Sequence, residues 1–148
     1  VPPMFRTIVF MAATMLAAPA FADGHASGDV AAGEKAFRQC VSCHVVVNDA
    51  GETLAGKKAK TGPNLYGIAG RTAGSVDGFK YSKIIMLAGE QGITYDEANF
   101  AGYVQDPTGW LREATGDKGR GKMTYKVRKE ADAINLYAYL ASLSGDGS

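Results

Sequence analysis

The sequence predicts an all-α protein with three main helices, several shorter helices and long loops. Helical periodicity marks both ends of the globular part, and no segment has a confident strand pattern. The chain has 19 glycines, most of them between the two end helices, where Pro63 and Pro107 also lie. At 148 residues, 46% hydrophobic and 21% charged, the chain has the size and composition of one globular domain. We expect this domain over residues 29–144, between a flexible N-terminal tail at 23–28 and a C-terminal tail at 145–148.

The first 22 residues differ in composition from the rest of the chain. One basic residue, Arg6, precedes a small and apolar run from Thr7 to Ala18, and Ala20-Phe21-Ala22 follows. This is the pattern of a secretory signal peptide with an A-x-A cleavage site. The run is shorter than the roughly 20 apolar residues of a membrane-spanning helix. We therefore expect residues 1–22 to be cleaved and the protein to be exported to the periplasm, with Met4 as a candidate start.

The first and last helices of the domain are predicted from caps and periodicity. Asp29 is a good N-cap for a helix over Val30–Gln39. The last helix is predicted over Glu130–Leu143, where apolar residues recur at spacings of three and four. Gly33 lowers the helix propensity of the first helix, and this indicates a close crossing with the last one.

A short helix and one extended segment are predicted in the middle of the chain. The helix covers about Lys83–Ala88, with Ser82 as its N-cap and Gly89 as its stop. Val45–Val47 is a candidate for a brief extended segment. The loops at 45–60 and 112–121 are expected to be long.

A third main helix is predicted between these segments. Thr94-Tyr95-Asp96-Glu97 has the pattern of a capping box that begins a helix, and Pro107 would end it. The expected buried face of this helix consists of Phe100, Tyr103 and Val104.

The segment Cys40-Val41-Ser42-Cys43-His44 has the C-x-x-C-H pattern of covalent c-type haem attachment. Two thiols on one helical turn can add to the two vinyl groups of a haem, and the histidine is then carried under the ring as an iron ligand. A thioredoxin-like dithiol would require alternating strands and helices, which the chain lacks. A zinc site would require two more ligands, and only His25 is available as a further Cys or His. Haem attachment is therefore favoured over both alternatives.

The sixth iron ligand has three candidates, and Met123 is the best of them. Met123 lies in a polar, glycine-rich loop with no apolar pattern that would bury it, and a thioether favours ferrous iron. Met86 lies in a short apolar helix, where a core methionine is the simpler explanation. His25 would lose chain entropy on reaching the iron from a flexible tail.

Pro63 is a candidate for a contact with the attachment histidine. A ligating histidine usually donates its second ring N–H to an acceptor such as a carbonyl, and a rigid proline turn could supply that carbonyl. An ordinary turn proline is an equally good explanation from the local sequence alone.

A series of short segments matches one family in order, from Gly28 to about Leu143. The segments are Gly33 and Phe37, Cys40 to His44, Lys60 to Gly67, Gly70-Arg71, Gly78 to Tyr81, Gly92 to Tyr95, Tyr103, Asp106-Pro107, Lys122-Met123 and Leu136 to Leu140. In these segments the chain resembles the class I cytochrome c family, and more narrowly its cytochrome c2-like bacterial branch. The resemblance implies a cytochrome c fold wrapped around one haem.

The same resemblance implies a role for each matching residue. Thioether bonds would form at Cys40 and Cys43, the axial iron ligands would be His44 and Met123, and the Pro63 carbonyl would orient His44. Tyr103 would lie beside the Met123 sulfur, and a buried haem propionate would be served by Arg71 and Tyr81. The family often has tryptophan where this chain has Tyr95, and threonine where it has Gly121. The propionate and Met-side hydrogen bonds of the family therefore cannot be carried over unchanged.

The distribution of charge along the chain indicates which classes of partner the protein could bind. After loss of the leader, 15 basic and 15 acidic residues remain, and this balance gives no indication of nucleic-acid binding. The segment from Arg112 to Lys129 nevertheless has seven basic residues and two acidic ones. Either this is a solvated loop, or it is a basic collar around the haem edge that attracts acidic partners; the position of Met123 inside it favours the collar. Further lysines could extend the collar: Lys57, Lys58, Lys60, Lys80 and Lys83.

The function that follows is outer-sphere transfer of single electrons, without enzymatic chemistry. The resemblance implies a bc1-type complex as donor and a photosynthetic reaction centre, terminal oxidase or reductase as acceptor, and we expect the carrier to be a monomer. The competing class is a haem enzyme or gas-binding protein with an open sixth site. The loop at Met123 and the lack of a distal histidine weigh against that class.

Overall fold

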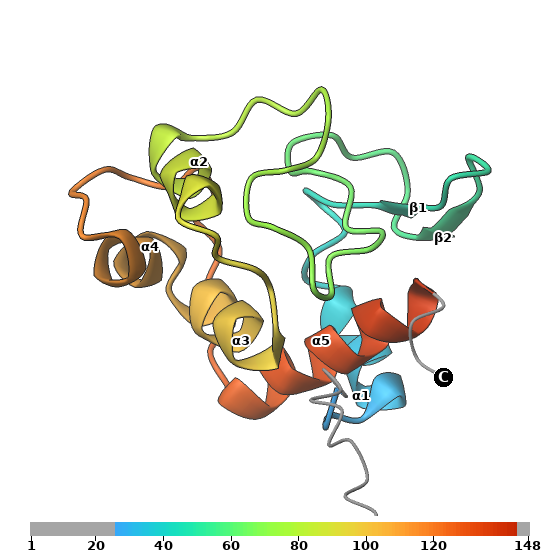
Figure 1. Ribbon diagram of the computed structural model, residues 1–148. Helices are drawn as coiled ribbons and strands as arrows, with labels where there is room; N and C mark the ends of the chain where they lie inside the picture. The colour runs from blue at the N-terminus through green and yellow to red at the C-terminus, as the bar shows by residue number, and fades with distance from the viewer. Residues whose placement is uncertain (1–25, 145–148) are drawn as a thin grey trace, which may run out of the picture.

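Five helices and one small sheet enclose the centre of the molecule in the computed structural model, which describes residues 26–144 (Figure 1). The helices are α1 (Val30–Phe37), α2 (Lys83–Glu90), α3 (Glu97–Gln105), α4 (Pro107–Thr115) and α5 (Glu130–Leu143), and the strands are β1 (Val46–Val47) and β2 (Thr53–Ala55). The expected signal peptide, His25 and the C-terminal tail lie outside the described residues. Within 26–144, no helix is both long and apolar enough to cross a membrane. The predicted all-α class is confirmed.

Helices α1 and α5 cross closely at Gly33, as predicted. A Cβ atom on Gly33 would lie 2.0 Å from the backbone oxygen of Asn135, so only glycine fits the crossing. The Asp29 carboxylate caps α1 by accepting from the Ala32 N–H at 2.6 Å, and the Asp29 N–H donates to the Asn135 side chain at 2.8 Å. Ser27, which precedes α1, also contacts the domain, since its N–H donates to the Glu97 carboxylate at 2.6 Å. The bond between Asp29 and Asn135 joins the two ends of the domain.

The C-terminal end of α1 leads into the cysteine segment through tight turns. The helix ends at Phe37, two residues before the predicted Gln39. The Cys40 N–H donates to the Phe37 carbonyl at 2.8 Å, and the His44 N–H donates to the Cys40 carbonyl at 2.9 Å. Such short-range bonds tighten the last turn of a helix. The cysteine segment is therefore a continuation of α1 as a chain of turns.

Two predicted helix boundaries in the middle of the chain are wrong. Helix α2 continues through Gly89 to Glu90, and Ser82 precedes it without a side-chain cap bond. Helix α3 begins at Glu97 with Asp96 as its N-cap, where the Asp96 carboxylate accepts from the Asn99 N–H at 2.7 Å, so Thr94 is not the cap. The predicted end of α3 before Pro107 is confirmed.

Helix α4 was not predicted. Pro107 ends α3 and also opens α4, because proline lacks an N–H that the first helical position does not need. Leu111 is fully buried, and the ring of Trp110 packs edge-on against Tyr103 of α3 at 6.0 Å between centroids. The supposed long loop at 112–121 therefore starts as helix and becomes irregular only after Thr115.

The sheet is a small antiparallel hairpin within the long loop at 45–60. Val46 pairs with Ala55 and Val47 with Thr53, with an irregular register between the two pairs. Val46 is completely buried, which explains why the extended segment forms there. The brief extension predicted at Val45–Val47 is confirmed, apart from Val45.

Candidate functional site

All residues that the resemblance connected with haem line one cavity in the centre of the molecule. They are Cys40, Cys43, His44, Pro63, Arg71, Tyr81, Tyr103 and Met123. Apolar side chains from distant parts of the chain complete its walls: Phe37, Leu65, Ile68, Ile85, Phe100, Val104, Leu136 and Leu140. The chain thus brings soft and nitrogen ligands to an apolar space, as a haem requires.

His44 has a fixed orientation in this cavity. Its Nδ1 donates to the Pro63 carbonyl at 2.9 Å, since a carbonyl can only accept. The imidazole lies on Gly62, where a Cβ atom would be 2.3 Å from the ring carbon Cε1. Burial lowers the pKa of His44, and the bond to Pro63 opposes this effect. The ring is therefore favoured as a neutral imidazole with Nε2 free to bind iron.

The two thiols lie beside His44 and do not form a disulfide. Burial, with the neighbouring Cys43 as a second cause, raises the pKa of Cys40 to about 11. Because the thiolate is the reactive form, a raised pKa keeps the free thiol inert at neutral pH. Because both thiols are reduced, the pair is available for thioether formation with a haem placed against it.

Met123 lies in the irregular segment after α4 and contributes to the same cavity. It is partly buried and lines the cavity. Met86 is 45% exposed on α2 and is not among the cavity residues, so the prediction of a core methionine there is wrong. Among the methionines that the structure describes, Met123 is the one that can reach a haem in this cavity.

Arg71 and Tyr81 line the cavity, and hydrogen bonds to the backbone hold both side chains. The Arg71 guanidinium donates to the carbonyls of Tyr66 at 2.9 Å and Asn64 at 3.2 Å. Burial lowers the pKa of Arg71, and the nearby Tyr81 opposes this effect. The Tyr81 hydroxyl accepts from the Val76 N–H at 3.1 Å, so both side chains are held in place. A cation and hydroxyls at this wall can receive an anionic group.

Tyr103 is less buried than the rest of the expected buried face of α3. Phe100 and Val104 are 5% and 6% exposed, whereas Tyr103 is intermediate and turns into the cavity wall. Its surroundings raise the pKa of the Tyr103 phenol to about 12, mainly through burial. The phenol therefore stays neutral and can donate a hydrogen bond.

These residues fit a covalently attached haem. Two reduced thiols, an imidazole with a fixed tautomer and a soft thioether face the same space, and its walls are largely apolar. The missing side chain of Gly62 makes room for the His44 ring, which would otherwise be displaced. The local sequence assigns no separate role to Gly62, because its contact with His44 depends on the tertiary fold.

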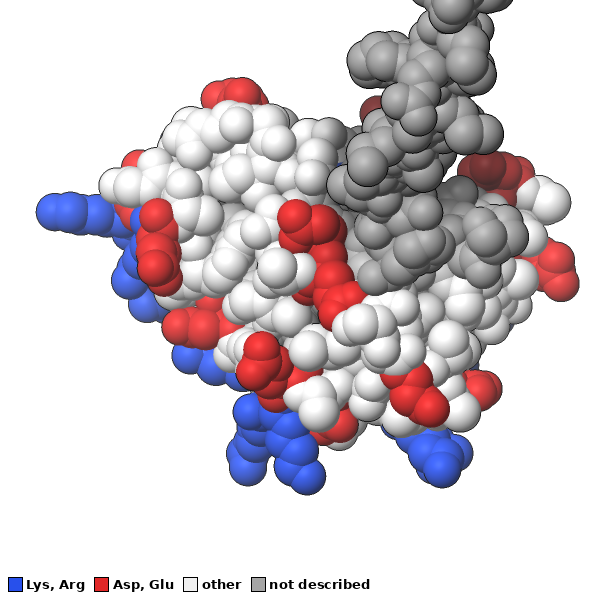
Figure 2. Space-filling view, turned by 60° about the horizontal axis from the view of Figure 1, so that its bottom comes forward, with Lys and Arg blue, Asp and Glu red and all other residues white. Residues whose placement is uncertain are grey.

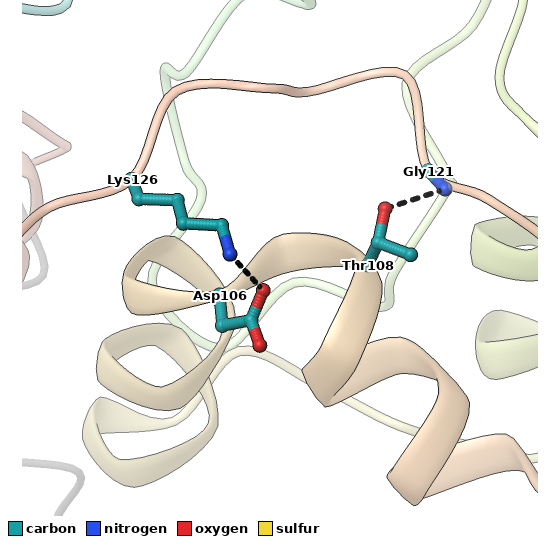
Figure 3. A network of polar contacts seen from close by, with 4 residues as sticks. All are labelled: Asp106, Thr108, Gly121 and Lys126. Carbon is teal, nitrogen blue, oxygen red and sulfur yellow. Dashed lines mark hydrogen bonds and ion pairs between the residues drawn. The ribbon is translucent and has the colours of Figure 1, made fainter.

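Sequence reasoning missed several residues that support the site. Thr108 and Asp106 contact the irregular segment that carries Met123, and both belong to the unpredicted start of α4 (Figure 3). The Tyr125 hydroxyl contacts the Gln39 side chain next to the cysteine segment. For Tyr125, the one signal in the sequence is its position two residues after Met123, which could have indicated that it lies at the cavity.

The buried Tyr95 leads to a testable pH dependence. Burial is the main cause that raises the pKa of the Tyr95 phenol above its ordinary value. Above about pH 10 the unfolded tyrosine loses its proton first, so the free energy of unfolding should fall as pH rises. We expect Tyr95→Phe to reduce this slope by up to about 1.4 kcal/mol per pH unit. Urea unfolding between about pH 9 and about pH 11 measures it, and identical slopes in both proteins would contradict the prediction.

The fold and the cavity define the class of the protein: an all-α chain that presents C-x-x-C-H, a fixed histidine and a methionine to one apolar cavity is a c-type cytochrome. The family-model search found no match. Cytochrome c2 of Rhodovulum adriaticum is 64% identical over 118 residues, which cover 79% of this chain and 94% of the relative. Cytochrome c2 of Cereibacter sphaeroides is 54% identical over 134 residues, 89% of this chain and 90% of the relative.

The structural comparison agrees with these relatives. The crystal structure of cytochrome c2 from Rhodobacter sphaeroides has a TM-score of 0.76 at 57% identity and covers 78% of this chain and 95% of its own. The chain therefore belongs to the cytochrome c2 family, with a class I cytochrome c fold. It carries one covalent haem c, and this favours haem attachment over the dithiol and zinc alternatives for its C-x-x-C-H motif. It is an electron carrier and not an enzyme.

Proposed function

We propose that this protein is a periplasmic carrier whose haem iron is bound by His44 and Met123, and that it moves electrons from a bc1-type complex to a reaction centre, terminal oxidase or reductase. The observation that carries this proposal is the convergence of His44 and Met123 on one cavity from distant segments of the chain. The leader pattern with Ala20-Phe21-Ala22 supports export. We further propose that the carrier acts as a monomer.

The chain's own residues would tune and protect the electron transfer. The haem supplies a one-electron iron couple when bound. The hydrogen bond from His44 to Pro63 fixes the imidazole, and a thioether from Met123 would favour the ferrous form and raise the reduction potential. The hydrogen-bonded Arg71 and Tyr81 would hold a haem propionate at the cavity wall. If His44 and Met123 both bind the iron, no position would be left open for a substrate, and no substrate bond would be made or broken.

Basic side chains around the cavity support the proposed contact with acidic partners. Lys122 lines the cavity, and its ammonium donates to the Lys80 carbonyl. The other cations of the basic collar are exposed: Arg112, Lys118, Arg120, Lys126, Arg128 and Lys129. On the face of the molecule in Figure 2, acidic side chains are scattered over the surface, whereas basic side chains gather at its margins. Such an uneven distribution orients a carrier during encounter.

A charge reversal in the collar tests this proposal. We expect Arg120→Glu to lower the second-order rate constant of electron exchange with a bc1-type complex roughly threefold to tenfold at low ionic strength. The effect should vanish at high salt, because the screening length falls from about 30 Å at 0.01 M to about 3 Å at 1 M. Stopped-flow kinetics across this range provide the measurement.

Lys35→Glu is the matched control for this experiment. It makes the same change of charge on an exposed residue of α1, outside the segment that forms the basic collar. We expect a much smaller change in its rate constant. Equal effects of both substitutions, or rates that do not depend on salt, would refute the basic collar as the docking surface.

A further inference from the structure

Helix α4 contacts the irregular segment that carries Met123 at two points. Residues 116–129, here called the methionine loop, contain no helix or strand. At the start of α4 the side chains of Asp106 and Thr108 both point toward this loop, one to Lys126 and one to Gly121 (Figure 3). The two contacts lie on either side of Met123. Helix α4 is therefore placed to limit how far the methionine can move.

The contact at Thr108 is the more protected of the two. The Gly121 N–H donates to the Thr108 hydroxyl at 3.1 Å, and Gly121 is buried. A Cβ atom on Gly121 would lie 3.2 Å from Leu111 Cδ1, so the loop backbone lies directly on α4. Loss of the acceptor would leave a buried backbone N–H without its partner, which costs more than loss of an exposed bond.

The contact at Asp106 is exposed and therefore weaker. The Lys126 ammonium lies 2.9 Å from Asp106 Oδ1, with 60% and 54% of the two side chains exposed. The hydrogen bond to Lys126 is the first cause that lowers the pKa of the Asp106 carboxyl. Exposed ion pairs contribute little and are screened by salt. A backbone bond from the Val127 N–H to the Val104 carbonyl, at 2.8 Å, holds the same end of the loop without charge.

We propose that Thr108 is a positioning residue that keeps Met123 on the haem iron by fastening Gly121 to α4. This inference rests on the proposed ligation by Met123. The loop opens and closes, and an external ligand can bind the iron only in the open form. Its apparent affinity therefore reports the open fraction. Loss of the Thr108 hydroxyl raises that fraction.

Imidazole binding to the ferric holoprotein tests the proposal. We expect Thr108→Val, which keeps the branched shape but removes the acceptor, to lower the apparent dissociation constant for imidazole about fivefold. Thr108→Ser retains a hydroxyl and should restore most of the wild-type value. Thr53→Val, an exposed change in β2 far along the chain from the methionine loop, is the control and should match wild type. Asp106→Asn should have a smaller effect that disappears at high salt.

The outcomes separate this inference from the proposed ligation. If the Met123–iron charge-transfer band is present in wild type and Thr108→Val binds imidazole as wild type does, the positioning role of Thr108 is wrong. The same holds if Thr108→Ser behaves like Thr108→Val. If wild type lacks the band, the proposed ligation itself is wrong. Urea unfolding of each variant shows that the protein stays folded during the imidazole titration. A change in the dissociation constant for imidazole then reports opening of the methionine loop and not global unfolding.

Discussion

Replacement of Met123 by leucine should remove the proposed sixth ligand while nearly preserving the side-chain volume. We expect the ferric protein to lose its sulfur–iron charge-transfer band at the red end of the spectrum. The reduction potential should fall on the order of 0.1–0.2 V, a fraction of the roughly 0.8 V that axial ligands span. The physical reason is the loss of a soft donor that favours ferrous iron. Optical spectra and a redox titration measure both effects.

Met86→Leu is the matched control, because it makes the same chemical change at a methionine that is 45% exposed and does not line the cavity. Its spectrum and potential should equal those of wild type. If Met123→Leu also left both quantities unchanged, Met123 would not be the ligand. A change with Met86→Leu alone would move the sixth position to α2, contrary to the cavity lining.

Replacement of Gly33 by alanine should destabilise the fold strongly, against the trend for helices. Alanine in a helix is ordinarily about 1 kcal/mol more favourable than glycine. Here the added Cβ would lie 2.0 Å from the Asn135 oxygen and 2.7 Å from the Tyr139 Cβ, so α1 and α5 would have to move apart. We expect a loss of about 2–3 kcal/mol in the free energy of unfolding, measured by urea titration of the ferric holoprotein.

The control for this prediction lies two residues earlier on the same helix. Ala31 is exposed, and Ala31→Gly should cost about 1 kcal/mol through helix propensity alone. The two substitutions are opposite in chemistry, yet both should destabilise. A Gly33→Ala protein as stable as wild type would show that the helix crossing can open without penalty.

The boundaries of the helices show which elements local sequence can predict. Helix α5 has the predicted bounds Glu130–Leu143, because its apolar residues repeat strongly at helical spacing and are buried together. The predicted start of α3 was wrong because Thr94 and Asp96 are both possible N-caps and lie only two residues apart. The Tyr95 N–H and carbonyl bond to Arg71 and Gly70, respectively, so this residue cannot enter the helix that a Thr94 cap would begin. Long-range pairing decided that boundary.

Helix α4 and Met86 show a different limit. The segment that starts at Pro107 has weak helix propensity and contains a proline that local rules interpret as a stop. It is helical because Leu111 is buried and Trp110 packs on Tyr103. In α2 the apolar run could not show which side faces the core; Ile84, Ile85 and Ala88 are buried, and Met86 points outward.

The sequence by itself determined the attachment motif, the preference for Met123 and the two helices that frame the domain. These features depend on residue types at short fixed spacings, which local chemistry is sufficient to interpret. The tertiary structure alone decided that the Pro63 carbonyl accepts from His44 across 19 residues, that Gly62 makes room for the ring, and that α4 fastens the methionine loop. Such contacts join segments far apart in the chain, and only the packing of the whole core brings them together.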